Sequence, residues 1–132
     1  MTPFAVGGPY QVQLTINAPY TYDSVYENLG VATIGPGVEY PNGWNGYFSV
    51  DLKLRKMTIT HLISVGYGSS SPDDFLGIVA TSLTSGAYLP QPAYFISYST
   101  ANPGILTSTA TTIALNLNGL TFYQGETIVI GW

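Results

Sequence analysis

Residues 47–65 read YFSVDLKLRKMTITHLISV. In the first half of this stretch every second residue is apolar, and a second alternation starts at Met57. Alternation with a period of two is typical of strands that bury one face. Because Leu54 and Met57 are three residues apart, they cannot share a strand face. The stretch therefore predicts two strands, 47–54 and 57–65, joined by a bulge or a tight bend.

The same alternation recurs along the chain, and turn residues separate the segments. Nine prolines and 15 glycines interrupt every window long enough for a helix. Six more strands are predicted at residues 10–17, 29–34, 75–84, 93–99, 111–117 and 126–132, with weaker candidates at 20–26 and 105–109. This spacing favours an all-β fold, an eight-stranded antiparallel β-sandwich of the jelly-roll type, in a single domain that covers residues 1–132.

Charged side chains make up 8% of the 132 residues, against about 25% in an ordinary soluble domain. A surface so poor in charge is covered by neighbours, or works where charge is of little use. The net charge of −4 argues against a broad basic face for nucleic acid. We therefore expect surfaces that bind other uncharged surfaces.

Several classes of protein are not supported by the composition. The chain has no cysteine, which excludes disulfide scaffolds, thiolate metal sites and thiol nucleophiles. No stretch reaches the roughly 18 apolar residues that a membrane span needs. The first residues lack the charged and apolar regions of a signal peptide, so we expect either no classical leader or one removed before this numbering.

Residues with catalytic chemistry are few. His61 is the single histidine, and the spacing offers it no metal-binding partners, so a structural or edge role is predicted. Asp73 and Asp74 are adjacent in a turn-like sequence, where they either start the next strand or serve as calcium ligands. No nucleophile elbow is present. The sequence therefore predicts no enzyme and no cofactor.

The three cations of the chain, Lys53, Arg55 and Lys56, lie within four positions at the bend between two predicted strands. They suit contact with an anionic partner, either genome phosphates or a carboxylate of a neighbouring subunit. They also suit protection of a strand edge against wrong pairing, because lysine at an edge or bend discourages it.

An aromatic and amide-rich loop at residues 39–47 is the second candidate site. Tyr40, Trp44 and Tyr47 suit a subunit interface, where aromatic residues are enriched. Stacking on a glycan and local packing over the end of the sandwich are the alternatives.

Residues 120–132 read LTFYQGETIVIGW, which resembles the last hairpin of jelly-roll modules. In those modules, which include capsid proteins and tumour-necrosis-factor-like trimers, Gly-Asp or Gly-Glu precedes a final apolar strand that pairs in mid-sheet. Glycine permits the turn, and the acid caps a position before the buried strand. With its size, its strands and its lack of cysteine, the chain is most similar to a single jelly-roll capsid protein of an icosahedral virus. The low charge resembles that of virion proteins from hot acidic settings, where archaeal viruses live.

This resemblance implies a structural virion protein that self-assembles into a shell with copies of itself and other capsid subunits. We also expect weak contact with nucleic acid through Lys53, Arg55 and Lys56, and we expect no membrane span. Two alternative functions stay open, and both would place the protein outside the cell or at the cell surface. One is a lectin-like module with Trp44, Tyr40, Asp73 and Asp74 at a sugar site. The other is a pilus or adhesive-filament subunit, whose residues 1–16 would lie outside their own sandwich.

Overall fold

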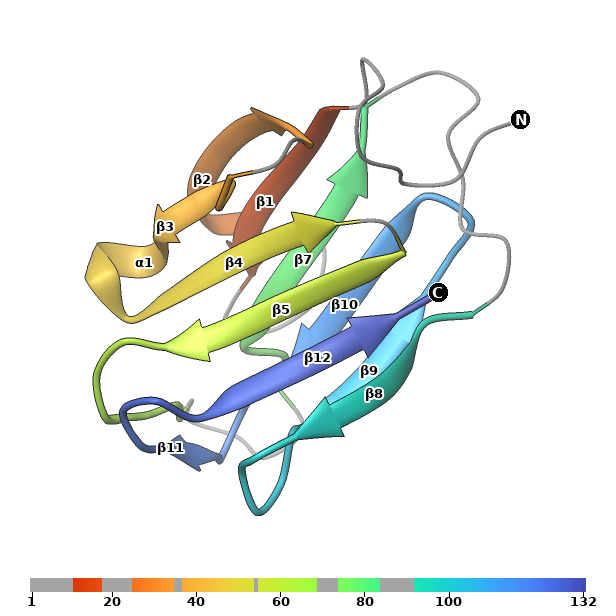
Figure 1. Ribbon diagram of the computed structural model, residues 1–132. Coiled ribbons are helices and arrows are strands. Elements are labelled where there is room, and N and C mark those ends of the chain that lie inside the picture. Colours follow the sequence, from red (N-terminus) through yellow and green to blue (C-terminus); the bar gives the residue numbers. More distant parts are fainter. Residues whose placement is uncertain (1–10, 18–24, 35–36, 54, 69–73, 84–91) are drawn as a thin grey trace.

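The computed structural model describes residues 11–17, 25–34, 37–53, 55–68, 74–83 and 92–132. These residues form antiparallel sheets and almost no helix, which confirms the all-β class. Two five-stranded sheets stack face to face, as Figure 1 shows, and a two-stranded ribbon lies at one end. No described helix is long and apolar enough to cross a membrane.

Each large sheet has a defined strand order. In the first sheet it is β2 (Val25–Thr33), β1 (Gln11–Asn17), β7 (Gly77–Ser82), β10 (Thr112–Asn116) and β9 (Ile105–Ser108). In the second sheet it is β3 (Tyr40–Asn42), β4 (Phe48–Lys53), β5 (Lys56–His61), β12 (Thr127–Gly131) and β8 (Tyr94–Tyr98). The ribbon pairs β11 (Thr121–Phe122) with β6 (Val65–Gly66). The short element α1 spans Gly43–Gly46.

The two large sheets contain ten described strands, so the predicted number of eight is wrong. One added strand is β9, which matches the weak candidate at 105–109. The other is β3, which lies in the stretch predicted as a loop and is held by a single pairing of Tyr40 with Val50. Such a short edge pairing leaves no periodic pattern in the sequence.

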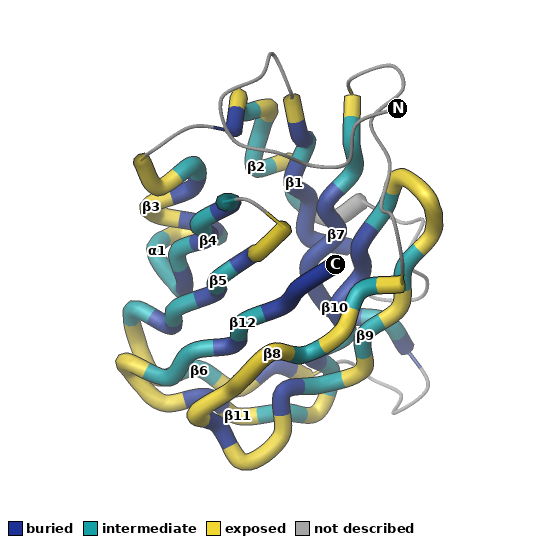
Figure 2. Tube along the Cα trace, turned by 45° about the vertical axis from the view of Figure 1, so that its right-hand side comes forward, coloured by how far each residue is buried: buried dark blue, intermediate teal, exposed yellow. Residues whose placement is uncertain are grey.

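One cluster of buried apolar side chains fills the space between the sheets. The predicted alternation places Val12, Leu14 and Ile16 of β1 in this core, each with no exposed surface. Figure 2 shows the buried positions concentrated on the central strands. Since a fully buried aliphatic side chain contributes roughly 1.5–3 kcal/mol, this cluster is the main source of stability.

The bend between the first two predicted strands is the turn of a hairpin. Lys53 and Lys56 are paired across β4 and β5, so the turn lies between them, and Arg55 belongs to it. Arg55 has a φ of 53°, in the left-handed region that such turns require. The predicted tight bend is confirmed, and Leu54 itself lies outside the described residues.

The second predicted strand is shorter than expected, because β5 ends at His61. The His61 amide donates to the carbonyl of Glu126 (2.9 Å), and the His61 carbonyl accepts from Gly125 (2.8 Å). These bonds tie the strand end to the turn before β12. Val65 then belongs to the separate strand β6.

The final strand follows the jelly-roll resemblance in two respects. β12 lies in mid-sheet between β5 and β8. In the preceding turn, Gly125 has a φ of 89°, and the Glu126 carboxylate accepts from the Tyr123 amide at 2.7 Å. The expected last hairpin is absent, however, because β11 pairs with β6 and not with β12.

Candidate interaction surfaces

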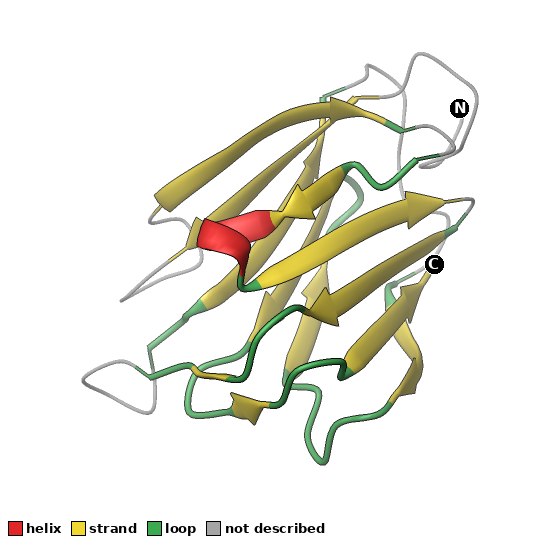
Figure 3. Ribbon diagram, turned by 60° about the vertical axis from the view of Figure 1, so that its left-hand side comes forward, coloured by secondary structure: helices red, strands yellow, loops and turns green. Residues whose placement is uncertain are grey.

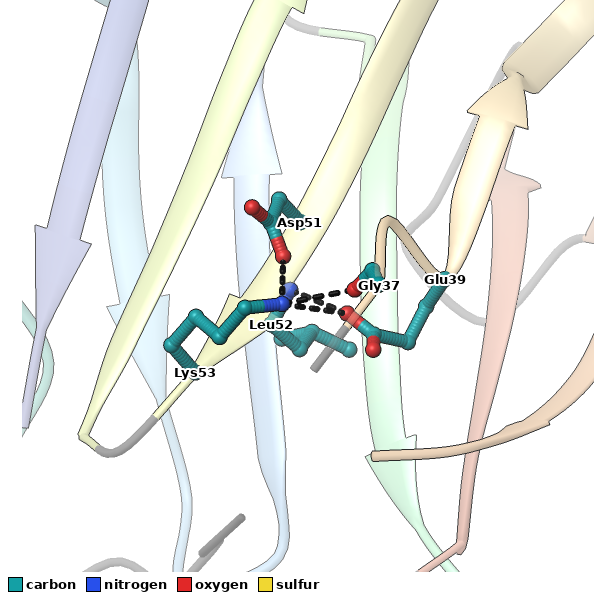
Figure 4. Close-up of polar contacts among 5 residues, drawn as sticks. All are labelled: Gly37, Glu39, Asp51, Leu52 and Lys53. Atoms are coloured by element: carbon teal, nitrogen blue, oxygen red, sulfur yellow. Dashed lines mark hydrogen bonds and ion pairs between the residues drawn. The ribbon is translucent and has the colours of Figure 1, made fainter. Parts of the chain in front are cut away.

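Lys53 is held by groups of its own chain (Figure 4). Its ammonium donates to the carboxylate of Asp51 and to the carbonyl of Gly37 (2.6 Å), and it lies 3.8 Å from Glu39 Oε1. The Glu39 side chain is almost fully buried and also accepts from the Leu52 amide at 2.6 Å. Lys53 therefore stabilises two carboxylates of its own subunit, and the structure does not direct it toward an external anion.

Arg55 and Lys56 are placed differently from Lys53. Both are exposed, at the tip of the β4–β5 hairpin. The backbone carbonyl of Arg55 accepts from the Trp132 amide at 3.3 Å, which joins the tip to the C-terminal end of β12. Of the predicted cluster, these two residues are the ones available for an anionic partner.

Tyr40 is a core residue and not an exposed aromatic. It is 6% exposed, and its hydroxyl oxygen lies 3.0 Å from the Val12 carbonyl and 2.9 Å from the Gly30 carbonyl. The single hydroxyl proton is shared between these two acceptors. Since Tyr40 belongs to the second sheet and its acceptors to the first, the bond links the two layers. Burial raises the pKa of Tyr40 to about 12. The prediction that Tyr40 contacts a neighbour or a glycan is therefore corrected to local packing.

Trp44 and Tyr47 are partly buried and pack against the core. The Trp44 ring stacks on Tyr67 at 5.8 Å and contacts Tyr47 at 5.3 Å. Trp44 and Asn45 have φ values of 46° and 56°, so α1 is one left-handed turn, which is visible as the single coil in Figure 3. This turn directs the Trp44 ring toward the sandwich, which favours local packing over glycan stacking.

His61 lies in the same aromatic cluster and is 1% exposed. Its ring stacks on Phe122 with centroids 4.3 Å apart and an angle of 2°, and its Nε2 lies 2.9 Å from the Tyr67 hydroxyl. Burial lowers the pKa of His61 to about 4, although Glu126 acts in the opposite direction. His61 is therefore neutral at pH 7 and structural, as predicted.

The acidic pair is only half described, since Asp73 lies outside the described residues. Asp74 is buried, and its backbone carbonyl accepts from the Asn118 amide group at 3.1 Å. Among the described residues, no three metal-ligating side chains come together.

The filament alternative makes a structural prediction that can be compared with β1. This strand lies inside the first sheet, between β2 and β7, and contributes three core residues. Residues 11–16 therefore complete their own sandwich, which argues against their donation to a neighbour. Residues 1–10 lie outside the described part of the chain.

Charge is distributed unevenly along the chain, a feature that was not used to predict a site from the sequence. Between Asp74 and Glu126 no residue is charged. The described residues of this run form five strands, β7 to β11, and among them is the last strand of each large sheet, β8 and β9. Figure 1 shows β8 in front of β9 on the same side of the sandwich. One side of the molecule therefore carries no formal charge on its strands.

This side also exposes large apolar and aromatic side chains, which we call the open edge: Tyr94 (47% exposed), Ile96 (50%), Tyr98 (49%) and Ile105 (66%). No described strand pairs with the outer side of β8 or of β9. An edge strand without charge or proline is a template for further pairing.

A groove of about 400 Å³ adjoins the open edge. Ile105, Thr107, Thr112 and Ala114 are among the residues that line it. Since Ile113 and Leu115 point into the core, the groove lies on the outer face of the first sheet. Its lining of methyl and hydroxyl groups matches the uncharged character of the edge.

Comparison with known proteins identified no matching family, no matching curated protein and no matching solved structure.

Proposed function

We propose that this chain is a structural protein, a capsid subunit that self-assembles into the shell of a virion. The observation that carries the proposal is the open edge: uncharged, rich in aromatic and aliphatic groups, and at the end of both sheets. The centre of a protein interface is depleted in charged residues and enriched in Tyr and Phe. The open edge has this composition while the subunit stands alone.

The strand order supports a jelly-roll winding. From β5 to β9 the chain alternates between the sheets, with β5 and β8 in the second and β7 and β9 in the first. β10 then returns between β7 and β9, and β12 returns between β5 and β8. Returning strands that insert between earlier ones characterise the Greek keys of jelly rolls, a fold common among capsid and lectin domains.

Electrostatics favour association through the open edge. The chain carries a net charge of −4, so two copies repel each other at neutral pH. The described carboxylates lie at Glu27, Glu39, Asp51, Asp74 and Glu126, none of them on β8 or β9. A contact between two copies of these strands therefore places no carboxylate on the paired strands themselves.

Arg55 and Lys56 supply a separate contact in this proposal. They are exposed at the hairpin tip, where they suit a carboxylate of a neighbouring subunit or a genome phosphate. Two cations in one subunit bind an anion weakly, but repetition around a shell multiplies the effect.

The proposal is tested by light scattering and electron microscopy of the purified chain at rising concentration, from pH 2 to pH 8. We expect discrete oligomers or closed particles. Protein that remains monomeric at high concentration across this range refutes the proposal. A monomer that binds a glycan array, with binding lost in Trp44→Ala, would support the lectin-like alternative instead.

A further inference from the structure

We propose that the first step of self-association is antiparallel pairing of β8 with β8 of a second copy, which joins two five-stranded sheets across a two-fold axis. This inference rests on the proposed self-assembly and deepens it, because it names the strand and the symmetry of the contact.

The open side of β8 is suited to strand addition. Three of its five residues are about half exposed, although β12 covers its other side. Tyr94 and Ile96 lie together on the outer face of the second sheet, since both side chains approach the position that a Cβ would take at Gly131. Any Cβ at Gly131 would meet the Ile96 side chain at 2.7 Å. Glycine at this position lets both side chains lie flat over β12 as an apolar ridge.

The inner face of β8 is incompletely covered in the single subunit. Phe95 is partly buried and packs against the edge of the core, and the centroids of its ring and the Tyr98 ring are 5.8 Å apart. Tyr98 is paired with Ile128, a fully buried residue, yet Tyr98 itself remains 49% exposed. A strand added beside β8 would cover these two rings and extend the core across the interface.

The other three edge strands are less suitable for pairing. β2 contains Glu27, and its pairing with β1 has two register shifts, one after Leu14 and one after Ile16. Bulges and charges are the usual protection of an edge. β3 is three residues long and includes Pro41, which cannot donate to a ladder. β9 has four residues. β8 has one register shift, at Ile96, but no charge and no proline.

A second copy fits this edge better than a charged partner. β8 and β9 offer no formal charge with which to select an oppositely charged surface. Two copies present identical uncharged strands, and antiparallel self-pairing gives a closed, isologous contact. Aromatic and β-branched side chains opposite each other stabilise an antiparallel pair, and Tyr94 with Ile96 of the other copy forms such a pair.

The symmetry supplies the experiment, since a residue near a two-fold axis lies close to itself in the partner. Ile96→Lys and Ile96→Glu each place like charges across the axis, and long side chains reach one another even at diagonal positions. We expect each variant alone to lose the dimer at concentrations where the unmodified chain is dimeric. A one-to-one mixture of the two variants should regain it as a heterodimer. Light scattering and mass spectrometry of the native complex measure both results.

The matched control is Val31→Lys on β2, the edge at the opposite side of the first sheet. Val31 is 53% exposed, close to the 50% of Ile96. This variant should leave the dimer unchanged. Circular dichroism of all variants establishes that they fold, and rescue by mixing cannot arise from unfolding.

The outcomes separate this inference from the proposed function. If Ile96→Lys assembles as well as the unmodified chain, β8 pairing is refuted while self-assembly stands. Loss of assembly without rescue in the mixture also refutes the two-fold contact, because β8 then meets a different surface. If the unmodified chain is monomeric throughout, both proposals fail.

Discussion

The chain has a single histidine, and its burial predicts that stability falls as the solution is acidified from pH 7 to pH 5. In the folded protein the pKa of His61 is lowered to about 4 because the ring is buried, whereas an exposed histidine has a pKa of 6.5. Below pH 6.5 the unfolded chain therefore binds a proton that the folded chain does not. Protonation thus favours unfolding, and the effect is complete only below about pH 4.

The size of the effect follows from the two pKa values. Each pH unit between them is equivalent to about 1.4 kcal/mol. Acidification from pH 7 to pH 5 should therefore lower the free energy of unfolding by at most about 2 kcal/mol. This window lies above the ordinary range of carboxylates, near pH 4, so His61 is the main side chain that titrates in it.

Urea unfolding at half-unit steps from pH 7.5 to pH 5 measures the loss, with monomeric protein at low concentration. In parallel, the NMR shift of the His61 ring proton should remain that of neutral imidazole down to about pH 5. The control is His61→Phe, which keeps the stacking on Phe122 but cannot titrate, so its stability should be flat across the window. A constant stability of the unmodified chain, or an equal loss in His61→Phe, would refute the reasoning.

Three further predictions concern stability, each measured by urea unfolding at pH 7. Tyr40→Phe leaves the buried carbonyl of Val12 and the partly buried carbonyl of Gly30 without their shared donor, and it should lower the free energy of unfolding by about 1–2 kcal/mol; no change would mean that water replaces the hydroxyl. Gly77→Ala places a Cβ 1.8 Å from the Leu115 carbonyl oxygen, so β7 and β10 must separate, and we expect a loss of about 3 kcal/mol or more. Lys53→Met leaves the buried Glu39 without its cation and should lower stability by about 1–2 kcal/mol, an effect reduced by the partial exposure of Lys53; unchanged stability would show that the Leu52 amide suffices.

The central strands could be predicted from sequence because burial of one face leaves a regular trace. β4 and most of β12 alternate between core and surface, whereas β1 does so only in its first half and is buried from Leu14 onward. The predicted bounds of all three strands agree with the structure within about two residues. The strand β3 could not be predicted, since it is held by a single pairing of Tyr40 with Val50. The length of β2 could not be predicted either. Gly30 and two register shifts break its alternation of apolar and polar residues, although the strand stays paired with β1.

The candidate sites were harder to predict because the sequence does not say which way a polar or aromatic group points. Tyr40 and Trp44 are neighbours in one aromatic loop, yet Tyr40 joins the two sheets and Trp44 turns onto Tyr67. Lys53 and Lys56 are three residues apart, but they lie on opposite arms of a hairpin, where Lys53 binds Asp51 and Lys56 is exposed. The open edge depends on strand order, which brings β8 and β9 to the same side only after the chain has folded.

Acid should destabilise the folded subunit but favour its association with other copies. Protonation of His61 weakens the folded subunit, while protonation of carboxylates removes the net negative charge, which vanishes near the isoelectric point of about 4.4. The β8 contact involves no titratable side chain except tyrosine, so it persists when repulsion between copies fades. Association stabilises the folded state in proportion to the logarithm of concentration. Near pH 4.4 the unfolding temperature should therefore rise with protein concentration, and in Ile96→Lys it should not.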